Sequence, residues 1–159
     1  MQMHPIEIVG VRVEMPSNQP IVLAKEMDGV RFLPIWVGAV EATAIAFAQQ
    51  GVVPPRPLTH DLFSEVIEKT GQAISKVLLT EIKDGIFYAE IYFQGGAVIS
   101  ARPSDALALA LRLGSPIFAS EELMSAAGVE VSDEGENPEA EVERFKEFLD
   151  HINPEDFAG

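Results

Sequence analysis

Apolar and polar positions alternate with a period of two near the start of the chain, as they do in β-strands. Valine occupies every second position in residues 9–13, and a further apolar run covers residues 21–24. Asp28-Gly29 is typical of a tight hairpin turn and precedes an apolar run over residues 32–37. The pattern therefore predicts three consecutive strands joined by short turns.

Helical spacing then replaces the alternation. Residues 39–50 are rich in alanine and lie between two glycines, which predicts a helix. A second helix is expected to begin near Thr59, whose side chain suits a helix N-cap. Four apolar residues of this second helix share one face: Leu62, Phe63, Val66 and Ile67.

The next half of the chain follows the same order of elements. Asp84-Gly85 predicts a hairpin between two strands, and Gly95-Gly96 leads into a third strand. The helix that follows is small or apolar almost all round, so we expect it to be buried. The predicted strands are residues 74–82, 86–93 and 97–101, and the predicted helices are residues 102–113 and 120–127.

An internal register supports a duplication. Residues 35–42 align with residues 99–106 at an offset of 64, which matches Glu41 with Asp105. We therefore predict an α+β fold in residues 1–128, built from duplicated β3α2 units at about residues 5–71 and 73–128. Because a lone unit would leave faces and edges uncovered, the strands should merge into one mixed or antiparallel sheet system or a barrel, flanked by helices.

The last part of the chain differs in character. Residues 129–159 carry −9 of the formal net charge of −14 and form an acidic extension. Asn137 and Pro138 suit the start of an amphipathic helix over about residues 138–152. Residues 1–128 are only mildly acidic, at −5, and neither part has the basic footprint of a strong nucleic-acid binder.

Composition narrows the class of protein. The 159 residues contain no cysteine, which excludes disulfides and thiolate chemistry. No apolar run approaches the length of about 20 residues that crosses a membrane. The first residues lack the basic and apolar regions of a secretory signal. We therefore expect a cytoplasmic protein without a membrane partner.

Polar residues at the predicted helix starts are the candidates for chemistry. The chain has no Gly-Lys-Ser/Thr phosphate loop and no Gly-x-Ser-x-Gly elbow, and its three histidines lack metal-binding spacing. The remaining candidates are Glu41, His60, Asp61, Arg102, Ser104 and Asp105.

Several of these residues have a structural explanation beside the functional one. Glu41 complements the helix dipole as a first-turn acid, or it is one of several carboxylates that hold a cation. His60 is a surface histidine, a general base or a metal ligand. Arg102 is a poor residue just before a helix, so it either forms an ion pair or binds a phosphate or carboxylate.

Three blocks of sequence together resemble the bifunctional nuclease domain family over roughly residues 5–128. They are LPIWVG at 33–38 with Glu41-Ala42, RPLTHDL at 56–62, and ARPSDALALA at 101–110. The resemblance implies duplicated β3α2 units that associate as homodimers or larger homo-oligomers. It also implies nuclease activity on DNA and RNA, with the polar residues of these blocks as the candidate site.

Two functions follow from these residues. In a nuclease, Glu41, Asp105 and Asp61 would hold Mg²⁺ or Mn²⁺, His60 would act as base, and Arg102 would neutralise the phosphate of a weakly bound nucleic acid. In a non-catalytic oligomerising or regulatory module, the acids would form a buried ion-pair network around Arg102. Exposure of the carboxylates distinguishes the two hypotheses.

Overall fold

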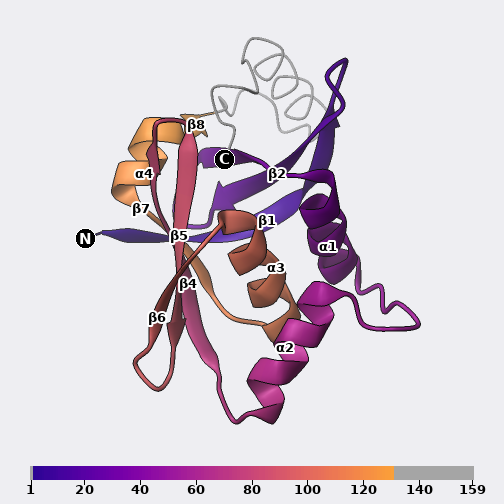
Figure 1. Ribbon diagram of the computed structural model, residues 1–159. Coiled ribbons are helices and arrows are strands. Elements are labelled where there is room, and N and C mark those ends of the chain that lie inside the picture. Colours follow the sequence, from indigo (N-terminus) through magenta and orange to yellow (C-terminus); the bar gives the residue numbers. More distant parts are fainter. Residues whose placement is uncertain (1, 131–159) are drawn as a thin grey trace.

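The computed structural model describes residues 2–130 as one open sheet of eight strands with four α-helices (Figure 1). The strand order is β6-β5-β4-β7-β1-β2-β3-β8, so the predicted α+β class is confirmed and the sheet does not close into a barrel. The strands are β1 Met3–Glu14, β2 Gln19–Glu26, β3 Arg31–Trp36, β4 Ile74–Lys83, β5 Ile86–Phe93, β6 Val98–Ala101, β7 Ile117–Ser120 and β8 Val129–Glu130.

The first three strands form the antiparallel meander that alternation predicted. β1 pairs with β2 along most of its length, with a register shift between Ile8 and Gly10. β2 then pairs with β3 across a loop of residues 27–30 that contains Asp28-Gly29. The register shift moves the pairing of the N-terminal part of β1 with β2 by one position. It therefore determines which residues lie opposite His4.

β4, β5 and β6 form a second antiparallel meander. Asp84 and Gly85 both adopt left-handed backbone conformations, with φ of 53° and 77°. A two-residue hairpin turn needs positive φ at both central positions to match the twist of its strands. The Asp-Gly pair therefore forms the turn that it predicted.

Strand β7, like the two-residue β8, is an element that the sequence did not reveal. It pairs antiparallel with β1 and parallel with β4, so it joins the two meanders into one sheet. Its four residues are too short for a periodic signal, and the pairing partners on both sides stabilise the strand. With β7 between its helices, the second half has one strand more than the first, and the duplication stays a prediction.

The helices begin and end close to their predicted bounds. Their bounds are α1 Ala39–Gln50, α2 Thr59–Lys69, α3 Pro103–Leu113 and α4 Glu121–Ala127. In α2 the N-cap is Leu58, so Thr59 is the first helical residue and not the cap. In the view of Figure 1, α1, α2 and α3 lie together on the right of the strands and α4 lies on the left.

The core lies between the sheet and the helices. Helix α3 is buried as predicted, with Leu107 fully enclosed and its neighbours from Ala106 to Ala110 at most 4% exposed. Helix α2 packs less completely, because only Ser64 and Ile67 are buried. Its other predicted core residues, Leu62, Phe63 and Val66, are each more than half exposed.

The start of the acidic extension pairs with the sheet. Val129 and Glu130 form β8 beside the first two residues of β3. The helix predicted over about residues 138–152 lies outside the described residues. Among the described residues, none of the helices is both long and apolar enough to cross a membrane.

Candidate functional site

Four of the six candidate residues meet at the starts of three helices. Arg102 Nη1 lies 3.1 Å from Glu41 Oε1, and Arg102 Nε lies 3.0 Å from Asp105 Oδ2. On the far side of Asp105, His60 Nε2 lies 2.8 Å from Oδ1. The cluster therefore runs from α1 through the N-cap of α3 to the first turn of α2.

Local sequence places these side chains. Pro103 occupies the first turn of α3, so Arg102 takes an extended backbone conformation as the N-cap residue. Asp105 then lies in the first turn and reaches back to the guanidinium. At α1, a Cβ on Gly38 would collide with the carboxylate of Glu41, so glycine allows this acid to fold over its own helix start.

The charges in the cluster favour their ionised forms. Burial raises the pKa of Asp105, but hydrogen bonds from His60 and Arg102 outweigh burial and leave this pKa below its ordinary value of 3.8. The hydrogen bonds to Asp105, followed by the contact with Glu41, raise the pKa of Arg102. Arg102 is therefore a permanent cation between two carboxylates.

The side chains of this cluster are neither fully exposed, as the nuclease hypothesis expects of the carboxylates, nor fully buried, as the module hypothesis expects. The side chain of Arg102 is 58% exposed, whereas Asp105 is 34% and Glu41 19% exposed. His60 is more enclosed, at 14%. A solvent-borne anion can thus reach the guanidinium, while the acids are largely held behind it.

Asp61 and Ser104 lie apart from this ion-pair cluster. Asp61 accepts a hydrogen bond of 2.7 Å from Arg112 Nε and another from the backbone N–H of Leu58. These interactions, Arg112 first, hold the pKa of Asp61 below its ordinary value. Ser104 is buried and helps to line a pocket of about 50 Å³ beside Arg102.

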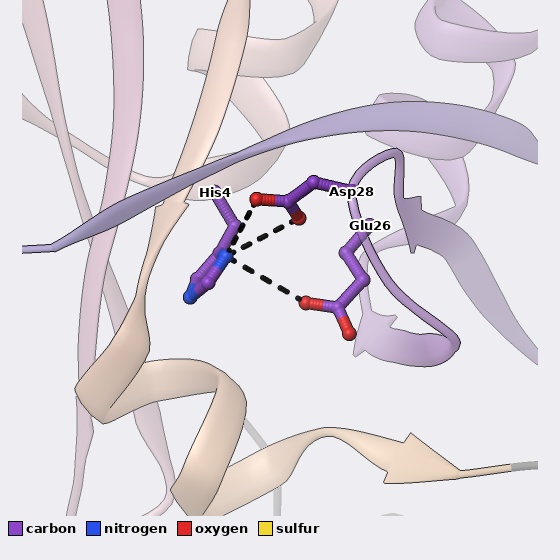
Figure 2. Close-up of side chains that lie close together, drawn as sticks. All are labelled: His4, Glu26 and Asp28. Atoms are coloured by element: carbon purple, nitrogen blue, oxygen red, sulfur yellow. Dashed lines mark hydrogen bonds and ion pairs between the residues drawn. The ribbon is translucent and has the colours of Figure 1, made fainter.

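The carboxylates suggested for Mg²⁺ or Mn²⁺ therefore do not form one set. Glu41 and Asp105 share Arg102, but Asp61 belongs to a separate pair with Arg112. Three possible ligand atoms of His, Asp or Glu lie within 4.8 Å of one another in just one group of residues 2–130. That group comprises His4, Glu26 and Asp28 (Figure 2).

This second cluster joins β1, the β2–β3 hairpin and α4. Figure 2 shows the His4 ring turned toward Asp28 and Glu26. His4 Nδ1 lies 3.0 Å from Asp28 and 3.9 Å from Glu26, and its Nε2 lies 2.6 Å from Glu121. Arg31 binds both Glu26 and Glu121, at 2.9 Å and 2.7 Å.

The charged groups of this second cluster shift one another's pKa values. The hydrogen bond with Asp28 is the largest influence on His4 and raises its pKa, against the effect of burial. Hydrogen bonds from Arg31 lower the pKa of Glu26 and, together with His4 and Ser125, lower that of Glu121 to about 2. Glu26 and Glu121 are therefore carboxylates at neutral pH.

Comparison with known proteins identifies the family. The model of the bifunctional nuclease domain matches residues 21–132. This chain belongs to the bifunctional nuclease domain family. The matched span contains all six candidate residues at the helix starts, whereas His4 precedes it.

Relatives fall into two groups. The uncharacterized protein Rv1829 of Mycobacterium tuberculosis is 47% identical over 161 residues, which cover 98% of both chains. Bifunctional nuclease 1 of Oryza sativa subsp. japonica and bifunctional nuclease 2 of Arabidopsis thaliana are each 27% identical. Those alignments cover 69% and 76% of this chain but only 35% and 40% of the plant proteins.

Sequence reasoning missed the second cluster of this bifunctional nuclease domain. The three histidines lack metal-binding spacing relative to one another along the sequence. His4 gains its acidic neighbours through strand pairing, which spacing along the sequence does not reveal. In the observed register Ile6 pairs with Glu26. Two residues further along both segments, the same register places His4 opposite Asp28. Counting back from the Pro16–Pro20 turn would misplace His4 by one residue, because the register shifts between Ile8 and Gly10.

Proposed function

We propose that this protein is a nuclease that hydrolyses phosphodiester bonds in DNA, RNA or both, with Arg102 at the centre of its site. The observation that carries the proposal is a half-exposed guanidinium flanked by two carboxylates and linked through Asp105 to an imidazole. Membership of the bifunctional nuclease domain family supports it.

Arg102 has the chemistry to bind the scissile phosphate. A guanidinium donates parallel hydrogen bonds to two phosphate oxygens and stabilises the negative charge that develops as water attacks phosphorus. Its contacts with Glu41 and Asp105 hold the planar group in position before substrate arrives. Binding of a phosphate would draw Arg102 partly away from these acids.

His60 and Asp105 form a pair suited to proton transfer. An ionised carboxylate only accepts hydrogen bonds, so the proton of the His60–Asp105 contact lies on Nε2. The other ring nitrogen, Nδ1, then remains to take a proton from the attacking water. When the P–O bond breaks, the imidazolium returns this proton to the leaving oxygen.

The predicted divalent ion fits these residues only in part. Glu41 and Asp105 supply oxygen ligands of the kind that Mg²⁺ and Mn²⁺ prefer. However, Arg102 lies against both carboxylates, and Asp61 is held by Arg112. Phosphate binding by Arg102 and proton transfer by His60 therefore require no metal ion in this proposal. The nuclease assay measures whether a divalent ion changes the rate of cleavage.

A nuclease assay on the purified full chain tests the proposal. Single- and double-stranded DNA and RNA are incubated with Mg²⁺, Mn²⁺ or EDTA, and products are resolved by size. We expect cleavage by the wild type and its loss in a Glu41→Gln/Asp105→Asn double variant of verified fold. Glu65→Gln/Asp84→Asn, which changes two exposed acids outside the cluster, is the matched control.

The result that overturns the proposal is equally defined. Absence of cleavage under all conditions removes it. Cleavage that persists in the double variant at the wild-type rate assigns the activity to another site or to a contaminant. In either case the alternative, a non-catalytic oligomerising or regulatory module, becomes the better account.

One observation supports the oligomerising part of that alternative, which the nuclease proposal also allows. Leu62, Phe63 and Val66 are each more than half exposed on α2, an apolar surface that association with a second copy would cover. Sedimentation velocity of the wild type and of Phe63→Ser measures this directly. A homodimer lost in the variant would support an interface at α2, and a monomeric wild type would contradict it; the cleavage assay then decides whether the assembly is catalytic.

A further inference from the structure

The His4 imidazole is enclosed by hydrogen-bond acceptors on both sides. Its Nε2 contacts Glu121, and its Nδ1 faces the carboxylates of Asp28 and Glu26. A neutral imidazole carries one N–H, so one of its nitrogens would present a lone pair to a carboxylate. The arrangement therefore requires a positive charge at Nδ1, supplied by a proton or by a metal ion.

The surrounding charge matches a divalent cation. Glu26, Asp28 and Glu121 contribute three negative charges, and Arg31 offsets one of them. With neutral His4, the cluster therefore has a net charge of −2. His4 and Glu26 are more than nine-tenths buried, so water screens the charge of Glu26 poorly, whereas the side chains of Asp28 and Glu121 are 47% and 41% exposed.

We propose that His4, Glu26 and Asp28 bind a divalent first-row transition-metal ion, with Zn²⁺ or Mn²⁺ as the ions of matching chemistry. Ligands of a four-coordinate Zn²⁺ at about 2.1 Å lie about 3.4 Å from one another. His4 Nδ1 lies 3.0 Å from Asp28 Oδ2 and 3.9 Å from Glu26 Oε2, on either side of that separation.

The partners of these ligands support the assignment. A metal-binding histidine commonly donates its other ring N–H to a carboxylate, and Glu121 occupies that position. Arg31 contacts both oxygens of Glu26, so this carboxylate is oriented before an ion arrives, and an ion would take the lone pair of Oε2 that Arg31 leaves free. Gly29 lets the hairpin approach, because a Cβ there would collide with Glu26.

The donor set also selects among metals. One imidazole nitrogen with two carboxylates suits Zn²⁺ and Mn²⁺, whereas Mg²⁺ prefers oxygen ligands and keeps much of its water. We therefore expect Zn²⁺ and Mn²⁺ to bind more tightly than Mg²⁺.

The metal site is distinct from the proposed nuclease site. Arg31 begins β3 and Trp36 ends it, so the two positions lie about 17 Å apart along the strand. Trp36 lines the pocket beside Arg102, whereas Arg31 contacts the metal cluster. A bound ion would join β1 to the β2–β3 hairpin, and the contact of His4 with Glu121 would link α4 to the same site, which is a structural role.

Metal titration of the full chain tests the proposal. The protein is treated with EDTA and dialysed, and its affinity for Zn²⁺ is measured by competition with a chromophoric chelator. We expect one ion per chain, a higher melting temperature with Zn²⁺, and at least tenfold weaker binding by Asp28→Asn. Asp84→Asn is the matched control, because Asp84 lies in the other tight hairpin outside the cluster.

Asp28 is the first choice for substitution because its side chain is 47% exposed in a loop, so the variant should fold. Zn²⁺ that Asp28→Asn binds as tightly as the wild type would overturn the site, as would a wild type that binds none. X-ray absorption of the Zn²⁺ complex gives a second readout. A histidine nitrogen in the first coordination shell is expected, and the absence of nitrogen contradicts the proposal.

Discussion

The guanidinium of Arg102 lies 3.1 Å from the carboxylate of Glu41, which joins the start of α3 to the start of α1. Asp105 holds the same guanidinium from α3 itself, at 3.0 Å. The two acids are the residues that the offset of 64 aligned. Both acids contact Arg102. Substitution of Arg102 can therefore separate its ion pairs, which stabilise the fold, from its proposed contact with a phosphate.

Arg102→Lys should separate charge from geometry. Lysine keeps the positive charge but cannot donate in the planar forked manner of arginine. Because Arg102 is 58% exposed, we expect the free energy of unfolding to fall by less than about 1 kcal/mol. Cleavage should fall about 100-fold, as for loss of a transition-state hydrogen-bond donor.

Urea unfolding and initial cleavage rates measure these two effects, with Arg12→Lys, at an exposed position of β1, as the control. A variant that loses several kcal/mol of stability while cleaving normally would show that Arg102 is a structural residue only.

The pair between Asp61 and Arg112 should make stability depend on pH. The pKa of Asp61 is lowered in the folded protein, so its contribution is fully present above the ordinary value near 3.8 and is lost as pH falls through the lower folded value. At pH 7, Asp61→Asn should cost about 2 kcal/mol because Arg112, only 9% exposed, keeps its charge without this partner.

Chemical unfolding at several pH values checks this prediction. The difference between wild type and Asp61→Asn should begin to shrink below about pH 4, where Asp61 of the unfolded chain takes up a proton, and should disappear below the lower folded pKa. Glu65→Gln, at an exposed position of the same helix, should show little change. A difference that stays constant down to pH 2 would contradict the assignment.

Ser120 should matter more than its size suggests. Its fully buried hydroxyl accepts from the backbone N–H of Leu123 and donates to the carbonyl of Thr80, at 3.0 Å and 2.6 Å. Ser120→Ala removes the cap of α4 and a link between β7 and β4, for a loss of about 2 kcal/mol. Thermal unfolding of Ser120→Ala, with the exposed Ser125→Ala as control, measures the effect. Equal melting temperatures of the two variants would contradict a stabilising role of Ser120.

Two leucines provide a test of the packing. Leu107 in α3 is completely buried, whereas Leu62 in α2 is 54% exposed. Leu107→Ala should lower the free energy of unfolding by about 3 kcal/mol through lost burial and a cavity. Leu62→Ala should cost less than about 1 kcal/mol in the monomer. Denaturant titration below the concentration of any self-association compares them, and similar losses would mean that α2 is covered.

Local sequence signals are sufficient to predict several elements of the fold. The Asp84-Gly85 turn formed because two adjacent residues accept positive φ, and α3 began at Pro103 because proline suits a first helical turn. The candidate residues at helix starts were identified for the same reason, since a polar residue at a helix end is visible without knowledge of the fold.

Long-range packing, which no local signal encodes, sets which of these residues come into contact. It placed Asp61 with Arg112 and Asp105 with His60, although His60 and Asp61 are adjacent in sequence. Strand β7 and the contact of His4 with Asp28 depend on pairing between distant segments and on one register shift in β1. Such contacts are set by the packing of the whole sheet, because local periodicity specifies which face a residue occupies but not which strand lies beside it.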